Sequence, residues 1–414
     1  MNMKKSWLLI LCLVLVAGVA LVGCAPEEGV TPPPPPPPEK EPFKVGLTAA
    51  ITGYGAVTYL PVAEGVRIYF EKINDEGGIN GHKVELYVED DRAEPARAVS
   101  NVKKFLGLGI NLLVIDSATA TYSGIFAECE KANIPIIIAM SGTAKELPPE
   151  PHPLIFGAFY NVMYDTNILL ARTLKDYEAG AIKMGLLGIN IPGAKFATET
   201  LNKYLLDAGM ETTMDFVPAG ATDVSPIASK IKAAGCNYAY FYGPGGYSIL
   251  LWRSLDKIGW DGTMLVLPSD PCELTLAEFK GRGERVVFFA LDAPLFFDYP
   301  IHKEIIATAE KYKATEINTS LCHGWISAKM VEEIFKKVSF PVSTEELLKV
   351  MNNLTVDHRP LYGVKTYTES DHVGSWTYLR LYKWDDEKET TVWVSDWYRA
   401  DPLAKKCEVV GPEL

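Results

Sequence analysis

From Phe43 onward, short apolar runs alternate with longer segments whose apolar residues recur at helical spacing. This alternation is typical of a parallel β-sheet with helices on both faces. It therefore predicts an α/β fold. The strands that we expect are 44–48, 84–88, 112–115, 136–139, 184–187, 238–242, 264–267 and 286–290.

Between the first two expected strands lies the clearest helical pattern. The glycines at 77 and 78 mark its end, because glycine permits the left-handed turn that closes many helices. A second helix is predicted over 165–177, and the strand–helix rhythm starts again near Met184. The apolar residues that define the first helix are Val62, Val66, Tyr69, Phe70 and Ile73.

Length and charge narrow the class of protein. Of the 414 residues, about 370 remain once an N-terminal leader and a proline-rich stretch are set aside, which suits two lobes better than one core. The chain has 40 basic and 52 acidic residues, a net charge of −12. So acidic a surface argues against nucleic acid and against polybasic docking on anionic lipid.

The leader has the order of parts that a signal peptide needs. A basic start at 1–5 precedes an apolar run at 7–22, which is short for a membrane span. The run ends in Leu-Val-Gly-Cys24, which resembles the lipobox of bacterial lipoproteins. The resemblance implies that 1–23 is a signal peptide and that Cys24 is lipidated. The alternative is an N-terminal membrane helix with a buried cysteine.

Seven consecutive prolines, Pro32–Pro38, follow the cysteine. Such a run extends as polyproline II at about 3.1 Å per residue, so that it spans roughly 22 Å. We therefore expect residues 24–42 to be a lipidated cysteine followed by a semi-rigid stalk.

The sequence lacks the common motifs for catalysis and for metal binding. There is no G-x-S-x-G or H-E-x-x-H, and the P-loop-like stretch 188–195 has Ala194 where the lysine should stand. The six histidines lie singly, and no cysteines form a C-x-x-C pair. We predict no enzyme activity, no cofactor and no metal, and at most two disulfides among the five cysteines that follow Cys24.

Several motifs together resemble a known family. They are Lys44–Leu47, Thr52–Gly55, Ala63–Gly65, Ile73–Gly81 with its double glycine, and Asp90–Asp91 with Pro95. The chain is similar in these to the opening of the type I periplasmic binding proteins, in the leucine/isoleucine/valine-binding branch that serves ABC importers. Stretches at 138–143, 220–231, 363 and 371–372 keep the family's order, so the resemblance covers roughly residues 43–400.

The resemblance implies two doubly wound parallel-sheet lobes joined by a three-stranded hinge. Lobe 1 would comprise 43–160 and 293–366, and lobe 2 would comprise 161–292 and 367–403, with 404–414 as a C-terminal tail. The lobes would close about the hinge on a small ligand.

Two loops at the carboxyl ends of expected strands fit such a ligand. Ala118–Thr121 and Ser141–Thr143 combine small residues with hydroxyls that can donate hydrogen bonds to a carboxylate. Helix N-capping is the alternative role for these hydroxyls. By resemblance, Ser141, Gly142 and Thr143 bind the carboxylate, whereas Ala118, Thr119, Ala120 and Thr121 form a loop in which Ala120 stands where the family often has serine.

The second lobe would supply the opposite wall. The glycine-rich turn after 238–242 resembles the family's aromatic loop and offers Tyr242, Gly245 and Tyr247, whereas Tyr240 could equally pack in the core. Asp270 lies where amino-acid binders place an acid for the ligand's ammonium, although Pro-Ser-Asp is also an ordinary turn. Further candidates for the apolar side are Thr52, Tyr54, Phe159 and Tyr160.

The sequence thus leads to three hypotheses. The first is a lipid-anchored monomer on the extracytoplasmic face of a bacterial membrane, which binds a branched-chain or other hydrophobic amino acid and delivers it to the permease subunits of an ABC transporter. The second keeps this role with an aromatic or aliphatic carboxylate that has no amine. The third is a ligand-sensing lipoprotein that signals to a membrane receptor.

Overall fold

The computed structural model describes residues 40–53, 55–140, 151–159, 165–243, 246–266, 278–279, 281–374, 376–401 and 406–412. The chain divides after Glu39, and every element named below belongs to the unit that starts at Lys40. The described strands form a five-stranded, a nine-stranded and a two-stranded sheet.

The five-stranded sheet is wholly parallel and has the order β2-β1-β3-β4-β5. Its register aligns Val45 of β1 with Leu112 of β3 and with Leu86 of β2. Its strands are β1 (Phe43–Ala49), β2 (Val84–Asp90), β3 (Leu112–Asp116), β4 (Ile136–Ile138) and β5 (Ile155–Gly157).

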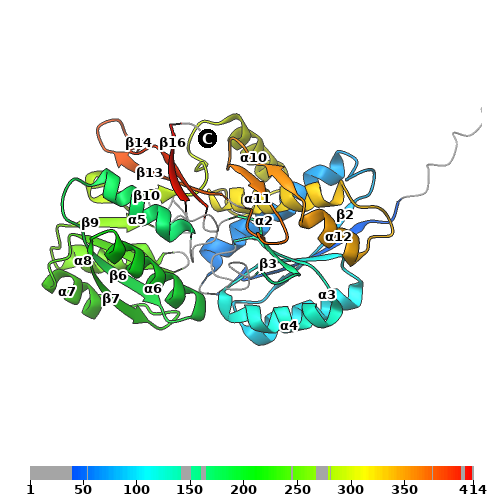
Figure 1. Cartoon of the computed structure of the whole chain (residues 1–414), viewed down its shortest axis with the longest axis horizontal. Coiled ribbons are helices and arrows are strands. Elements are labelled where there is room, and N and C mark those ends of the chain that lie inside the picture. The colour runs from blue at the N-terminus through cyan, green and yellow to red at the C-terminus, as the bar shows by residue number, and fades with distance from the viewer. Residues whose placement is uncertain are drawn as a thin grey trace, which may run out of the picture. The chain divides into compact units, whose positions relative to one another are not determined.

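Helices cover both faces of this sheet, and we call the sheet and these helices the first lobe. Leu112 and Val114 of β3 point into the core on the α2 and α11 side, whereas Leu113 and Ile115 point towards α3 and α4. Figure 1 shows these two helix pairs on opposite sides of β3. The helices are α2 (Ala56–Asp75), α3 (Pro95–Leu108), α4 (Tyr122–Ala132), α10 (Pro300–Lys311), α11 (Ser320–Phe335) and α12 (Thr344–Met351).

The nine-stranded sheet has the order β16-β15-β13-β10-β9-β8-β6-β7, and β14 also pairs with β13. The part from β7 to β10 is parallel, as expected, but β13, β14, β15 and β16 are antiparallel additions. The strands are β6 (Lys183–Ile189), β7 (Glu211–Val217), β8 (Tyr238–Tyr242), β9 (Thr263–Val266), β10 (Val286–Ala290), β13 (Thr377–Asp385), β14 (Thr390–Trp393), β15 (Trp397–Asp401) and β16 (Lys406–Gly411).

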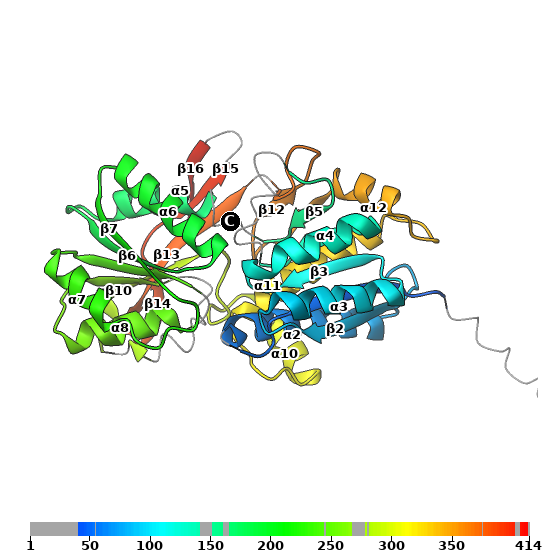
Figure 2. The same ribbon diagram turned by 90° about the horizontal axis from the view of Figure 1, so that it is seen from below.

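This sheet and its helices form the second lobe. Leu186 and Tyr240 face α5 and α6, whereas Leu187 and Phe241 face α7 and α8, and Figure 2 shows the two helix pairs on opposite faces. Residues 406–411 lie in the stretch that we expected to be a tail, but they form strand β16 of this sheet. The helices are α5 (Asp165–Tyr177), α6 (Pro192–Asp207), α7 (Ser225–Ala233) and α8 (Tyr247–Lys257).

Four short elements complete the described fold. A two-stranded antiparallel sheet, β11 (Thr355–Asp357) with β12 (Val364–Thr366), follows α12. The 3₁₀ turns are η1 (Thr119–Thr121) and η2 (Gly283–Arg285). Within the described part of the chain, no helix combines the length and apolar character that a bilayer crossing requires.

The described cysteines do not form disulfides with one another. Cys129, Cys236 and Cys322 are buried as free thiols, and Cys407 is a partly buried free thiol. Cys272 lies outside the described residues.

Helices α2 and α11 touch backbone to backbone where they cross. A Cβ atom at Gly65 would lie 2.3 Å from the carbonyl oxygen of Leu321, and one at Gly324 would lie 2.0 Å from that of Val62. Both distances are far shorter than a van der Waals contact, and a backbone carbonyl cannot move aside as a flexible side chain can. Glycine at both positions is therefore what allows the two helices to pack so closely.

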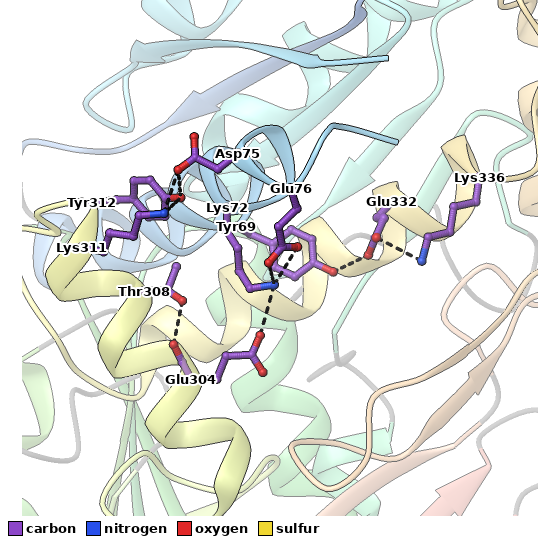
Figure 3. Close-up of polar contacts among 10 residues, drawn as sticks. All are labelled: Tyr69, Lys72, Asp75, Glu76, Glu304, Thr308, Lys311, Tyr312, Glu332 and Lys336. Carbon is purple, nitrogen blue, oxygen red and sulfur yellow. Dashed lines mark hydrogen bonds and ion pairs between the residues drawn. The ribbon is translucent and has the colours of Figure 1, made fainter. Parts of the chain in front are cut away.

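Polar contacts join α2 to α11 and to α10 (Figure 3). The hydroxyl of Tyr69 on α2 donates to Glu332 on α11, and the Tyr69 ring packs edge-on against Trp325 with centroids 4.7 Å apart. Burial, helped by the Glu332 charge, raises the pKa of Tyr69. Lys72 joins α2 to α10 through Glu304 at 3.3 Å.

The glycine contact gives a direct test. We expect Gly324→Ala to lower the free energy of unfolding by about 1–3 kcal/mol, because the added methyl must push apart two packed backbones. Chemical denaturation followed by circular dichroism measures the loss. The matched control is Gly107→Ala in α3, where the new Cβ would meet nothing within 4 Å. That variant should be unchanged or up to about 1 kcal/mol more stable, since alanine favours a helix. Equal effects of the two substitutions would contradict the argument.

Candidate functional site

Both large sheets have a point where the strand order reverses. In the first lobe the chain leaves β1 for β2 on one side and returns to β3 on the other, and in the second lobe β7 and β8 flank β6 in the same way. Loops beyond the carboxyl ends of the strands at such points form the usual ligand crevice of open α/β sheets. The loops after β1, β3, β6 and β8 are therefore the candidate site.

The loop after β1 is held by a carboxylate of the neighbouring strand. Thr52 donates to Asp90 through its hydroxyl at 2.5 Å and through its backbone N–H at 3.2 Å. These hydrogen bonds lower the pKa of Asp90, although partial burial acts against them as the largest single influence. Thr52 itself is exposed, so the loop presents it at the surface while Asp90 fixes its position.

The loop after β3 contains Ala118–Thr121. The Thr121 hydroxyl is fully buried and donates to the Ala118 carbonyl at 2.9 Å, so it closes its own turn. Thr121 also precedes α4 as its N-terminal flanking residue, but its side chain makes no capping hydrogen bond. The Thr119 hydroxyl accepts a hydrogen bond from the Gly193 backbone N–H of the second lobe at 3.2 Å. Ala120 is partly exposed beside it.

In the second lobe, the predicted aromatic residues have different surroundings. Tyr247 is buried, and its hydroxyl accepts the Gly220 backbone N–H at 2.6 Å. Tyr242 ends β8 and stays partly exposed. Tyr240 is 1% exposed and packs near Phe289, with ring centroids 6.1 Å apart, so for Tyr240 the core alternative is confirmed.

The remaining predicted residues lie outside the part of the chain that the structure describes. These are Cys24, Tyr54, Ser141, Gly142, Thr143, Tyr160, Gly245 and Asp270.

A buried polar cluster underlies the first-lobe loops. Asp91 is fully buried and accepts three hydrogen bonds, from Ser117 Oγ at 2.7 Å, the Ala93 backbone N–H at 2.8 Å and Thr48 Oγ1 at 2.9 Å. Asn101 of α3 donates in turn to Thr48 at 3.2 Å. Burial raises the pKa of Asp91, and the three hydrogen bonds oppose that rise.

A second buried carboxyl group, Asp116, lies on the opposite face of the sheet. It ends β3, is 1% exposed, and neither of its oxygens accepts a hydrogen bond of ordinary length from a described residue. Burial raises the pKa of Asp116 well above its usual range, the Asp91 charge adds to the rise, and the Ala63 backbone N–H lowers it. Asp91 accepts three hydrogen bonds of ordinary length, whereas Asp116 accepts none of that kind from the described residues, so the charge belongs on Asp91 and the proton on Asp116.

The sequence reasoning did not single out Asp116. The only sequence feature that could have indicated Asp116 is its place at the end of an apolar run. An aspartate in that place is common at strand ends and does not by itself indicate a buried, protonated carboxyl group.

Phe159, predicted on the apolar side of the ligand, is fully buried and lies two residues after β5. Its ring stacks on His323 of α11 at 4.4 Å and packs against Tyr362 at 4.9 Å. His323 Nε2 lies 3.3 Å from Asp292, which follows β10. Phe159 follows β5 of the first sheet and Asp292 follows β10 of the second, so these contacts hold both segments against α11. The His323–Asp292 pair was not predicted from the sequence.

The fold, the paired switch points and the loops that meet there define a two-lobed solute-binding protein. A family profile described as periplasmic binding protein matches residues 42–389. The chain belongs to this family, as a type I member of its leucine/isoleucine/valine-binding branch, whose members serve ABC transporters outside the cytoplasm.

One relative matches nearly end to end. The Leu/Ile/Val-binding protein homolog 3 of Brucella melitensis is 26% identical over 357 residues, which are 83% of this chain and 92% of that protein. The leucine-, isoleucine-, valine-, threonine- and alanine-binding protein of Pseudomonas aeruginosa is 27% identical over 54% of this chain and 59% of its own length.

Solved structures share the fold. A fatty acid ABC transporter substrate-binding protein from Thermomonospora curvata has a TM-score of 0.73 at 17% identity and covers 90% of this chain and 96% of its own. A solute-binding protein from R. palustris in complex with 4-hydroxybenzoate has a TM-score of 0.75 at 14% identity, with 88% and 98% covered. Their titles name a substrate-binding protein and a solute-binding protein of ABC transporters, and the likeness shows the shared fold.

The raised pKa of Asp116 predicts a pH dependence of stability. The native carboxyl holds its proton above the unfolded value of about 3.9, so the native state binds more protons than the unfolded state across that window. Stability therefore falls as pH rises through it, by up to about 1.4 kcal/mol per pH unit for one proton. We expect Asp116→Asn to remove most of this slope, measured by denaturation at a series of pH values above 4.

Asp75 is the matched control. It is exposed, and hydrogen bonds from Lys311 and Tyr312 lower its pKa. Its stabilising contribution is present above the unfolded pKa and is lost in acid, so Asp75→Asn should change the slope in the opposite sense and only slightly. An unchanged pH profile in Asp116→Asn would refute the assignment of the proton to Asp116.

Proposed function

We propose that this chain binds a small carboxylate with an apolar body, first of all a branched-chain or other hydrophobic amino acid, and delivers it to the permease of an ABC importer. The observation that carries the proposal is the near end-to-end match to the Leu/Ile/Val-binding protein homolog 3 of Brucella melitensis, 26% identical over 92% of that protein. The match also extends over 83% of this chain.

The mechanism is ligand-driven closure. We place lobe 1 at 43–160 with 293–366 and lobe 2 at 161–292 with 367–411, the last range extended to take in β16, so that the chain crosses between the lobes three times. A ligand held by loops of both lobes gains its full contacts only when they close, so its higher affinity for the closed form shifts the population. In this proposal Ser141, Gly142 and Thr143 receive the carboxylate, and Asp270 receives the ammonium.

A second candidate ligand is a carboxylate without an amine. It is favoured by the solved neighbours, whose titles name a fatty acid transporter and complexes with 4-hydroxybenzoate, benzoate and 3,4-dihydroxybenzoic acid. Such a ligand needs the carboxylate loop and an aromatic wall, for which Tyr242 is available, but no acidic partner.

A ligand panel separates the two candidates. We expect leucine, isoleucine or valine to raise the melting temperature and 4-methylpentanoate, which has leucine's side chain and carboxylate without the amine, to have no effect. At a hundredfold excess over Kd, a ligand stabilises the native state by about 2.7 kcal/mol, which a thermal-shift assay detects readily. A response only to 4-methylpentanoate or to benzoates would exclude the amino-acid ligand and support the second candidate.

Asp270→Asn sharpens the same measurement. If Asp270 pairs with the ammonium, this variant should lose most of its affinity for leucine, because one partner of a buried charge pair is then left without the other. Titration calorimetry gives the change in Kd. The matched control is Asp261→Asn, at an exposed position shortly before β9. This variant should bind leucine with the Kd of the unmodified chain.

We further propose that Cys24 carries the lipid that holds the protein at the extracytoplasmic face of the membrane, with residues 24–42 as the stalk. We expect Cys24→Ser to move the protein from the membrane fraction to the soluble fraction, since a lipid chain supplies about 0.8 kcal/mol of membrane affinity per buried CH₂. Fractionation and the intact mass of the purified chain check this. Retention of the variant in the membrane fraction would favour a membrane helix instead.

A further inference from the structure

Helix α6 of the second lobe begins without a cap from its own sequence. The residue before it is Ile191, which has an extended backbone with φ −121° and ψ 153° and makes no side-chain capping hydrogen bond. The first N–H groups of a helix have no partner within the helix, and Pro192 has no N–H at all. Gly193 is thus the first residue of α6 whose N–H needs an acceptor.

That acceptor comes from the other lobe. The Gly193 N–H donates to Thr119 Oγ1 at 3.2 Å, although the two residues are 74 positions apart in the chain. Thr119 is the first residue of η1, in the loop that follows β3, and threonine hydroxyls are among the preferred acceptors at helix N-termini. Thr119 therefore acts as an N-cap for α6, although it is not the residue that precedes this helix in the chain.

Apolar contacts accompany this hydrogen bond. Ile191 packs against a small cluster of three buried alanines, Ala50, Ala93 and Ala118, which are 0%, 9% and 1% exposed. The alanines come from the loops after β1, β2 and β3, so that three loops of the first lobe meet one branched side chain of the second. Small side chains leave the room that Ile191 fills.

The loop that carries Ala93 is held in an uncommon conformation. Arg92 and Ala93 have positive φ angles of 55° and 59°, which residues other than glycine seldom adopt. The carboxylates of the preceding residues accept their backbone N–H groups, Asp90 from Arg92 at 3.0 Å and Asp91 from Ala93 at 2.8 Å. The acidic pair at the end of β2 thereby fixes Ala93 beneath Ile191.

We propose that Thr119, capping α6 from the other lobe, and Ile191, seated on the alanine cluster, form a latch that stabilises the closed state. The latch comprises Thr119, Ile191, Gly193 and the three alanines. It rests on the proposed closure of the lobes about a ligand. Both of its contacts join residues of different lobes, so both are lost when the lobes open. The Gly193 N–H then donates to water, and the Ile191 side chain becomes exposed.

The latch lowers the free energy of the closed state, so less of the ligand's binding free energy is needed to close the protein. The closed state is the form that holds the ligand from both sides, so the observed Kd varies inversely with the fraction of ligand-free molecules that are already closed or readily close. Thr119 and Ile191 are then positioning residues, which change affinity through the closing equilibrium. The loss should fall mainly on the dissociation rate.

The experiment measures closure without any ligand. Spin labels introduced as unnatural amino acids replace Lys103 on α3 and Lys203 on α6, whose side chains are 61% and 70% exposed. Pulsed dipolar spectroscopy on the full chain in mild detergent then gives the populations of the open and closed distances. We expect Thr119→Val, which keeps the shape and removes the hydroxyl, to lower the closed-to-open ratio about fivefold, the effect of losing one helix cap.

Companion variants separate the latch from general damage. Thr119→Ser keeps a hydroxyl and should restore the ratio, and Ile191→Ala should lower it as Thr119→Val does. The matched control is Thr344→Val, because the Thr344 hydroxyl donates to the Asn133 carbonyl at 2.9 Å within the first lobe. This variant loses one threonine hydrogen bond within the first lobe and none to the second lobe, so the closed-to-open ratio should not change.

The same variants titrated with leucine and with benzoate tell failure of the latch from failure of the proposed ligand. Whichever compound binds should lose affinity in Ile191→Ala by the factor seen without ligand, and in Thr119→Val by at least that factor, because the Thr119 hydroxyl is also a candidate ligand contact. If neither binds, the ligand proposal fails and the ligand-free ratios still decide the latch. An unchanged ratio in Thr119→Val and Ile191→Ala, or an unmodified chain with no measurable closed population, would overturn the latch even if Thr119→Val weakened binding.

Discussion

The close crossing of α2 and α11 is the constraint on which the rest of the fold depends. Helix α11 follows the second lobe's parallel strands in sequence, yet it packs on α2 with the backbone of Gly324 against that of Val62. This contact brings the chain back to the first sheet after it has built β6 to β10. The chain must then leave again to form β13, and the segments that cross carry Phe159 and Asp292 to His323 on the same helix.

The burial of each strand explains which parts of the fold could be predicted from sequence. The strands of the parallel cores are buried on both faces and read as apolar runs, so 238–242 and 286–290 were predicted with the bounds that the structure has. Strand β7, Glu-Thr-Thr-Met-Asp-Phe-Val, was missed because it is an edge strand with mostly polar, half-exposed residues. The antiparallel strands from β13 onward were missed as well, since the pattern sought was that of a parallel sheet.

The candidate site was predictable in position but not in its contacts. The loop after β3 was identified from its small residues and hydroxyls, which is local information. The hydrogen bond between the Gly193 N–H and the Thr119 hydroxyl depends on the relative positions of loops from two lobes. A local sequence pattern cannot predict such a contact. Asp116 is similar, because its unusual protonation follows from complete burial and from the donors that Asp91 takes, both of which are properties of the folded chain.

The ligand role predicted for Thr119 and the latch role proposed for it are compatible, because a hydroxyl has one proton and two lone pairs. In accepting the Gly193 N–H, Thr119 Oγ1 uses a lone pair and keeps its proton available for an acceptor such as a carboxylate. A carboxylate that received that proton would make the oxygen a better acceptor for Gly193, since hydrogen bonds in a chain polarise one another. Ligand binding in the first lobe would then strengthen the cap on a helix of the second lobe, which couples recognition to closure through a single side chain.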